Sequence, residues 1–188
     1  MLICAGNGEE FEGVRSVGVG LIESTITLTE ICAHQKPECL IFIGSAGSYS
    51  LEVELLGLYA STHATQIESS LLTHASYTPL KQSIDSLLVP CETIERIHAL
   101  GLSQMRVNSS NYITTDRAHA ARMLERGIGL ENMEFFALMS VARRYGVPAM
   151  GVFCVSNYCH TEAHNEFVQN HGAVKEKLQN LVSRILGR

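Results

Sequence analysis

Residues 39–48, Cys39-Leu40-Ile41-Phe42-Ile43-Gly44-Ser45-Ala46-Gly47-Ser48, decide how this chain folds. The first five form a continuous apolar run, which is typical of a strand buried on both faces of a parallel sheet. The glycine- and serine-rich residues that follow predict a loop at the carboxyl end of that strand. A second apolar run, Val147 to Val155, is entered through Pro148 and predicts a second buried strand. Two such strands indicate an α/β fold.

Strand and helix patterns alternate on both sides of these runs, which predicts a layered α/β domain around a largely parallel sheet. No repeat, low-complexity segment or domain boundary is visible, so we expect residues 1–188 to form a single domain. Further strands are predicted at Leu2 to Ala5, Val14 to Val19 and Leu55 to Thr62. Helices are predicted at Leu21 to His34, Cys91 to Leu100, Glu131 to Tyr145 and Glu166 to Leu186, and Thr114-Thr115-Asp116 is predicted to cap a further helix that runs through Glu125.

Composition and charge limit the classes of function. Hydrophobic residues make up 46% of the 188 positions and charged residues 18%, as in globular proteins. The net charge of −5 and the lack of a basic run argue against a nucleic-acid-binding surface. No apolar stretch reaches the ~20 residues that span a bilayer. We therefore expect a cytoplasmic protein with neither nucleic acid nor a membrane as its partner.

The cysteines and histidines give no support to a metal site. The six cysteines include no CxxC pair, and most of them sit in or beside apolar runs, where free cysteine behaves as a small buried hydrophobe. His160 and His164 are spaced to share a helix face, but no third ligand is evident. No metal is expected.

Ligands of open α/β sheets bind beyond the carboxyl ends of the strands. Candidate positions here are Gly6 to Glu10, Gly44 to Ser48, Asn108 to Thr115, Ser156 to His160 and the start of the helix predicted at Glu131. Each segment taken alone is also what an ordinary turn or an exposed helix start would contain. Their order and spacing together are more specific than any one of them.

That order resembles the nucleoside phosphorylase superfamily, which includes purine nucleoside phosphorylases, uridine phosphorylases and methylthioadenosine/S-adenosylhomocysteine nucleosidases. The resemblance covers nearly the whole chain and is weakest from Gln66 to Leu100. It implies a three-layer, phosphorylase-type domain around a central mixed, largely parallel sheet. The segments that carry it are Val17-Gly18-Val19-Gly20, Ile43-Gly44-Ser45-Ala46-Gly47, Asn132-Met133-Glu134 and Val155-Ser156-Asn157.

The resemblance also implies roles for individual residues. Three are catalytic candidates: Glu134 matches the glutamate that holds the ribose 2′ and 3′ hydroxyls, and Asn157 matches the position of the base-recognising aspartate. Glu10, with Glu9 as the alternative, matches an acidic residue near the nucleophile. The substrate-binding candidates are Gly44 and Ser45 for phosphate or water, Tyr112 and Ile113 for the base, and Asn132 and Met133 for the sugar.

Three departures from the family pattern bear on the reaction. An amide cannot transfer a proton, so Asn157 in place of aspartate makes 6-oxopurine substrates plausible. Phe42 stands where phosphorylases carry an arginine, with Arg15 or a neighbouring subunit as possible substitutes. The segment between Glu10 and Val14 is also tens of residues shorter than in full-length members.

These observations leave three hypotheses. The favoured one is cleavage of the N-glycosidic bond of a purine nucleoside by the phosphorylase route, with inorganic phosphate as co-substrate and no other cofactor. The second is hydrolysis by the nucleosidase route, and the third is a catalytically silent nucleoside-binding paralogue. The resemblance further implies a homodimer or a larger homo-oligomer.

Overall fold

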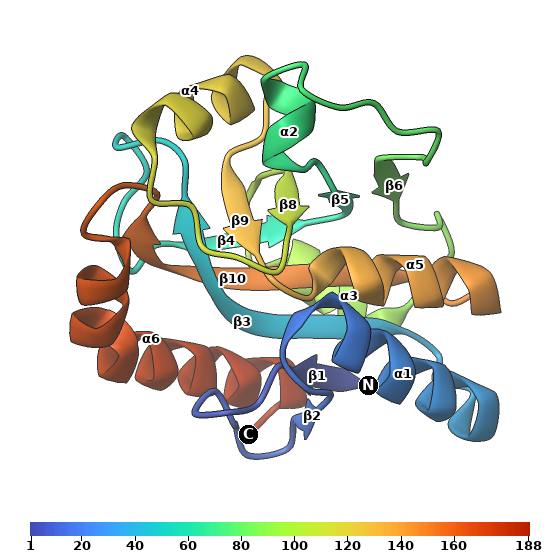
Figure 1. The fold of residues 1–188 in the computed structure, drawn as a ribbon. Coiled ribbons are helices and arrows are strands. Elements are labelled where there is room, and N and C mark those ends of the chain that lie inside the picture. The colour runs from blue at the N-terminus through green and yellow to red at the C-terminus, as the bar shows by residue number, and fades with distance from the viewer.

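A mixed sheet of ten strands runs through the computed structural model, which describes all residues from Met1 to Arg188. Helices cover both faces of the sheet (Figure 1). The strands are β1 (Leu2–Cys4), β2 (Arg15–Ser16), β3 (Leu40–Ser48), β4 (Leu58–Ser61), β5 (His63–Thr65), β6 (Ser83–Asp85), β7 (Ser103–Gln104), β8 (Val107–Ser109), β9 (Leu130–Asn132) and β10 (Ala149–Tyr158). The helices are α1 (Gly20–Gln35), α2 (Ser69–Leu72), α3 (Glu92–His98), α4 (Arg117–Glu125), α5 (Phe135–Tyr145) and α6 (Ala163–Leu186).

The two apolar runs form the centre of the sheet, as predicted. β3 and β10 pair in parallel from Leu40↔Ala149 to Ser48↔Tyr158, and the sheet order is β6-β5-β8-β9-β3-β10-β4-β7, with β1 on the first part of β3. Successive side chains of β3 alternate between two hydrophobic clusters: Leu40 and Phe42 join one, Ile41 and Ile43 the other. The period of two, with both faces apolar, is why this strand is buried on both sides.

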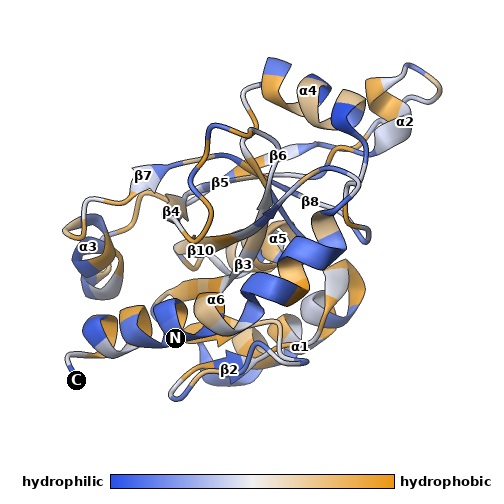
Figure 2. Cartoon of the chain, turned by 90° about the vertical axis from the view of Figure 1, so that its left-hand side faces the viewer, coloured by the Kyte–Doolittle hydropathy of each residue, from blue (hydrophilic) through white to orange (hydrophobic).

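Each cluster lies under its own layer of helices. α1 and α5 pack against each other on one face of the sheet, whereas α6 covers the other face together with α3. Figure 2 shows that the apolar parts of these helices turn toward the sheet and the hydrophilic parts away from it. The prediction of helices on both sides of a largely parallel sheet is confirmed.

The loop predicted at Gly44 to Ser48 is wrong, because β3 continues through Ser48. Beyond Ile43 the strand keeps its pairing with β10 and bends, as Figure 1 shows, until Gly47 and Ser48 also pair with the antiparallel strand β9. β10 likewise extends past Val155 through a bulge to Tyr158. Hydrogen-bonding partners on both sides of these polar residues keep them extended, and the bulge re-aims their side chains.

The helix predicted to start at Glu131 begins four residues later. Leu130–Asn132 forms β9, which pairs with β3 and β8, and α5 starts at Phe135. The Asn132 side chain ends the strand and caps the helix by accepting hydrogen bonds from Glu134 N (2.8 Å) and Phe135 N (2.9 Å). Cross-strand pairing therefore overrides a local pattern that suits a helix.

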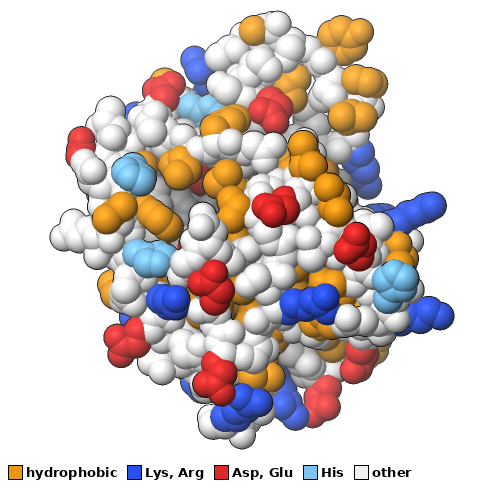
Figure 3. All heavy atoms as spheres, turned by 60° about the horizontal axis from the view of Figure 1, so that its bottom comes forward, with side chains coloured by type: hydrophobic (Ala, Val, Ile, Leu, Met, Phe, Trp, Pro, Cys, Tyr) orange, Lys and Arg blue, Asp and Glu red, His pale blue; other side chains and the backbone are white.

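The remaining predicted elements are present but mostly shorter. The strand expected at Val14 to Val19 is reduced to β2, while Asp116 caps α4 by accepting a hydrogen bond from Ala118 N (2.9 Å). No helix combines the length and the apolar character needed to cross a bilayer. On the face seen in Figure 3, basic and acidic side chains are interspersed rather than gathered by sign.

Candidate active site

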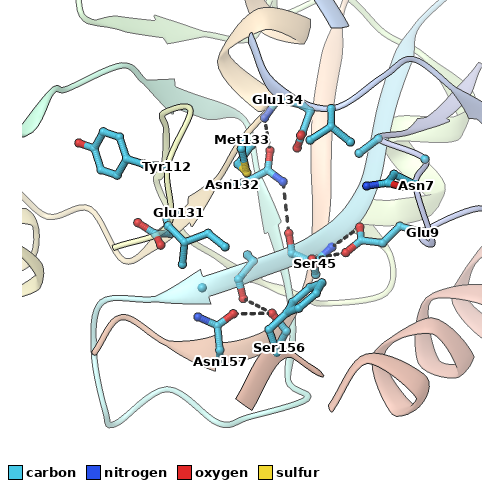
Figure 4. Close-up of a pocket in the computed structure, with 17 residues that line it drawn as sticks. Asn7, Glu9, Ser45, Tyr112, Glu131, Asn132, Met133, Glu134, Ser156 and Asn157 are labelled. Atoms are coloured by element: carbon cyan, nitrogen blue, oxygen red, sulfur yellow. Dashed lines mark hydrogen bonds between the residues drawn. The ribbon is translucent and has the colours of Figure 1, made fainter. Parts of the chain in front are cut away.

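A cavity lies where the carboxyl ends of β1, β3, β8 and β10 meet β9 and the start of α5. Figure 4 shows the polar side chains that surround it. Its walls combine apolar surface with three carboxylates, three asparagine amides and two serine hydroxyls. The lining residues are Ala5, Gly6, Asn7, Glu9, Val19, Ser45, Ala46, Gly47, Tyr112, Ile113, Glu131, Asn132, Met133, Glu134, Ser156, Asn157 and Phe167.

Glu134 lies at the junction of β9 and α5 and is 4% exposed. Its Oε1 accepts a hydrogen bond of 2.9 Å from Gly20 N, at the first residue of α1. Burial raises the pKa of Glu134 to about 7, partly opposed by this hydrogen bond and reinforced by the negative charge of Glu9. The carboxylate is thus held by the chain while it faces the cavity, where it can accept hydrogen bonds from vicinal hydroxyls.

The hydrogen bond to Glu134 depends on the backbone conformation of Gly20. Gly20 has a φ of +83°, and a Cβ there would lie 3.0 Å from Oδ1 of Asn111. That Oδ1 accepts a hydrogen bond from Leu21 N (2.9 Å). Glycine supplies this left-handed conformation without steric cost. The motif at residues 17–20 therefore contributes a backbone donor at Gly20 as well as Val19 in the cavity wall.

A second carboxylate pairs with Ser45 on β3. Ser45 N donates to Glu9 Oε2 at 3.1 Å, and the Ser45 hydroxyl donates to Glu9 Oε1. A Cβ on Gly44 would fall 2.6 Å from the ring of Phe42 and 3.3 Å from Glu9 Oε2. Gly44, a predicted substrate-binding residue, therefore leaves room for the Glu9 side chain and does not line the cavity.

Of the two adjacent glutamates, the resemblance favours Glu10 as the acidic residue near the nucleophile. That prediction is wrong in its position, because Glu9 lines the cavity and Glu10 does not. After the turn at Asn7 and Gly8, the Glu10 carboxylate folds back and accepts hydrogen bonds from Gly8 N at 3.1 and 3.2 Å, outside the cavity and exposed to solvent. Glu9 takes the position beside Ser45. The side chains of two adjacent residues leave a turn in different directions. The sequence contains no signal that predicts which of Glu9 and Glu10 points into the cavity.

No lysine or arginine lines the cavity. Phe42, which stands at the position of the phosphorylase arginine, is fully buried and packs with Phe135 and Phe153 at ring-centroid distances of 6.5 and 5.7 Å. Arg15 is exposed and lines a different cavity, beside Met1 and Leu2. Within this chain nothing replaces the missing arginine.

At the opposite end, Ser156 is the extra residue of the bulge in β10, and Asn157 follows it. The Ser156 hydroxyl donates to Asn157 Oδ1 (2.7 Å), and Asn157 Nδ2 donates to the Tyr158 carbonyl (3.2 Å). Asn157 is 5% exposed. The serine thus orients the amide so that its nitrogen remains a donor with a second hydrogen available.

The other predicted contacts lie around the same cavity. Tyr112 and Ile113 line it, with the Tyr112 hydroxyl accepting a hydrogen bond from Ser69 N (3.1 Å), and Met133 lines it beside Glu134. Asn132 also lines it, but its amide is engaged by the chain: besides capping α5, Nδ2 donates to the Ser45 carbonyl at 3.2 Å. Asn132 therefore braces β3 against the start of α5.

The most informative residue that the sequence argument missed is Glu131. It lines the cavity, is 6% exposed, and its Oε1 accepts a hydrogen bond from Thr114 N (2.9 Å). The sequence predicts a helix that starts at Glu131, and a glutamate at the start of a helix is ordinarily exposed to solvent. For this reason Glu131 was not proposed as a site residue. As the middle residue of a strand it alternates with Leu130 and Asn132, and that alternation was the available signal.

Comparison with known families identifies the chain. The model of the phosphorylase superfamily matches residues 2–187. The chain belongs to the phosphorylase superfamily. Among curated members, it is 23% identical over 146 residues to a DeoD-type purine nucleoside phosphorylase from Geobacillus stearothermophilus. That match covers 77% of this chain but only 62% of the relative, so the chain spans less than two thirds of the length of that phosphorylase.

Solved structures of nucleosidases and of a hydrolase share the fold. A 5′-methylthioadenosine/S-adenosylhomocysteine nucleosidase from Helicobacter pylori superimposes with a TM-score of 0.82 at 15% identity, over 99% of this chain and 96% of that one. Futalosine hydrolase from the same organism gives 0.81 at 16% identity over the same shares. A nucleosidase from Neisseria meningitidis gives 0.80 at 14%, over 98% and 96%.

Proposed function

We propose that this superfamily member hydrolyses the N-glycosidic bond of a purine nucleoside. The observation that carries the proposal is the pair of Glu9 and Ser45 in a cavity that contains three glutamates and neither lysine nor arginine. A phosphate dianion needs cationic or charge-assisted donors, whereas a water molecule needs an acceptor for its proton. The walls of this cavity suit water.

The two ends of the cavity bind different parts of the nucleoside. Glu134 grips the 2′ and 3′ hydroxyls of the ribose, above Met133, and its negative charge favours the oxocarbenium-like sugar that forms as the bond breaks. A water held by Glu9 attacks the anomeric carbon and gives its proton to that carboxylate. The bond electrons leave with the base, which takes up a proton from solvent while Asn157 donates a hydrogen bond to it, and Glu9 returns the proton it accepted to solvent.

Phosphorolysis is the second candidate, because the curated relatives are purine nucleoside phosphorylases. It would require a cation from outside this chain, since Phe42 is buried and Arg15 lies elsewhere. A neighbouring subunit is one possible source. The homo-oligomer and the cytoplasmic location both stay predictions.

The test is base release from inosine, guanosine, adenosine and methylthioadenosine, each with and without phosphate. Equal release in both conditions, with free ribose or its 5′-thioether as the sugar product, would support hydrolysis. Release that requires phosphate and yields a sugar 1-phosphate would contradict hydrolysis and establish the phosphorylase reaction. No release from any substrate would favour the silent paralogue.

A further inference from the structure

Helix α1 begins without a capping side chain of its own. Its first residue, Gly20, follows Val19, whose side chain contains no hydrogen-bond acceptor. The first N–H groups of a helix have no partner within the helix, so they need acceptors from elsewhere. Here Glu134 Oε1 accepts from Gly20 N at 2.9 Å. The amide oxygen of Asn111 accepts from the next N–H, that of Leu21, also at 2.9 Å.

Asn111 belongs to the loop that carries Tyr112 and Ile113, the two cavity residues that we assign to the base. Asn111 itself does not line the cavity. On the other side of the pair, Thr114 N donates to Glu131 Oε1 at 2.9 Å. The loop is therefore attached to α1 on one side of Tyr112 and Ile113 and to β9 on the other.

The contact between Asn111 and the start of α1 is close. A Cβ on Gly20 would lie only 3.0 Å from Asn111 Oδ1, so the amide oxygen rests against the backbone whose N–H binds Glu134. An ionised carboxylate is favourable at this end of a helix. If the Asn111 oxygen were removed, the first turn of α1 would be free to shift, and the Gly20 donor would shift with it.

We propose that Asn111 is a positioning residue, which holds the first turn of α1 so that Gly20 N stays bonded to the Glu134 carboxylate. Through this bond the loop on the base side of the cavity and the carboxylate on the sugar side are set in place together. The inference rests on the proposed function for the role of Glu134 at the ribose. Asn111 is exposed to solvent, so its substitution should leave the fold intact.

The groups around Glu134 make this link measurable. Burial raises the pKa of Glu134 to about 7, and the bond from Gly20 N opposes that rise. The negative charge of Glu9 raises the pKa further, whereas the side chain of Asn132 and the backbone of Met133 lower it. Of these influences, only the bond from Gly20 N depends on the position of α1.

The first test is the titration of Glu134, which needs no turnover. Asn111→Ala should raise the pKa of Glu134 by at least about half a pH unit, because a hydrogen bond to the charged form keeps a carboxyl pKa low. NMR of the ¹³C-labelled glutamate carboxyls measures the change, and the signal missing in Glu134→Gln identifies the residue. An unchanged pKa in Asn111→Ala would overturn the proposal.

The second test is whether Asn111 acts through Glu134. Asn111→Ala should lower kcat/KM for base release about tenfold, within the range of coupling between residues of one hydrogen-bond network. In the Glu134→Gln background the same substitution should change kcat/KM by less than about twofold, because the carboxylate that it positions is already lost. Additive losses in the double variant would mean that the two residues act independently and would overturn the proposal.

Asp116→Ala is the matched control. Asp116 also gives a helix start its side-chain acceptor, at 2.9 Å from Ala118 N, but the helix is α4 and not α1. Thermal unfolding should therefore show a similar loss of stability in Asp116→Ala and Asn111→Ala. Asp116→Ala should keep the pKa of Glu134 and hold kcat/KM within about twofold of wild type. Equal losses of kcat/KM in the two variants would mean a general loosening of the loop and would overturn the proposal.

The two proposals fail separately. Cleavage that requires phosphate would remove the hydrolase and leave the role of Asn111 standing, because Glu134 holds the ribose in either reaction. Phosphate-independent cleavage with an unchanged pKa of Glu134 in Asn111→Ala would leave the hydrolase standing and remove the role of Asn111. If no nucleoside is cleaved, the NMR titration alone decides whether Asn111 positions Glu134.

Discussion

Glu134 and Glu131 are three residues apart, equally buried and held in similar ways, yet they serve opposite ends of one cavity. Each accepts one backbone hydrogen bond of 2.9 Å, from Gly20 N and from Thr114 N respectively. The neighbours of Glu134 are themselves partnered, with Asn132 capping the helix and Glu9 bound to Ser45. The neighbours of Glu131 are the buried side chains of Tyr49 and Cys159, and burial and the charge of Glu131 raise the pKa of both.

The two ends of the cavity therefore differ in how far the chain itself positions their polar groups. At the end that we assign to the ribose and the nucleophile, the chain itself holds both carboxylates, Glu134 at Gly20 N and Glu9 at Ser45. The end that we assign to the base keeps one N–H of the Asn157 amide without a partner in the chain, so a ligand can supply the acceptor. Preorganisation at the first end favours catalysis, whereas unpaired groups at the second favour discrimination between bases.

The largest expected effect is at the ribose end. Glu134→Gln should lower kcat/KM for base release by about a thousandfold, because removing one preorganised electrostatic contact costs on the order of 10²–10³. Circular dichroism should show an unchanged fold. Glu125→Gln, an exposed glutamate at the end of α4, is the control and should behave as wild type. Near wild-type activity of Glu134→Gln would remove this residue from the site.

The same carboxylate predicts a dependence of stability on pH. Its pKa rises from 4.5 in the unfolded chain to about 7 in the folded one, so the folded state binds more protons in between. The free energy of unfolding should therefore decline as pH rises through this window, by up to about 3 kcal/mol at ~1.36 kcal/mol per pKa unit. Urea unfolding at pH 5 and pH 8 measures it.

Glu134→Gln should remove that part of the pH dependence, whereas Glu125→Gln should keep it. Substrate affinity should follow the opposite sign, since the ionised carboxylate accepts from the sugar hydroxyls and forms as pH rises through about 7. An identical pH profile of stability in wild type and Glu134→Gln would mean that the group does not titrate in this window.

A smaller effect should separate two adjacent glutamates. Glu9→Gln should lower kcat about a hundredfold, the lower range for loss of a general base. Glu10→Gln should stay within about twofold of wild type, because its carboxylate bonds to Gly8 N outside the cavity. Initial rates at saturating inosine compare the two. The reverse order would return the catalytic role to Glu10.

The smallest effect should appear at the base end. Asn157→Asp introduces a group that can accept from an amino substituent and, when protonated, donate to the ring, so preference should shift about tenfold toward 6-aminopurines. The ratio of kcat/KM for inosine and adenosine measures the shift. An unchanged ratio would count against base recognition by Asn157 and would weaken the division between the two ends.

Much of this site could be located from local sequence patterns, but not the direction in which each side chain points. Ser45, Tyr112, Ile113, Asn132, Met133, Glu134 and Asn157 were all expected near one pocket, and the structure places all seven in the wall of one cavity. Gly44 and Glu10 were expected there too and lie outside the wall. A short turn and the bend of β3 decide those two positions, and both depend on contacts distant in sequence.

The sequence by itself determined the layered sheet, because the continuous apolar runs at 40–43 and 149–155 have to be buried on both faces. It also determined which segments end at the carboxyl edge of the sheet. Only the tertiary structure decided that residues 130–132 pair as a strand between β3 and β8, which turns Glu131 into the cavity. The pairing with β3 joins residues more than eighty positions apart, and no local pattern contains that information.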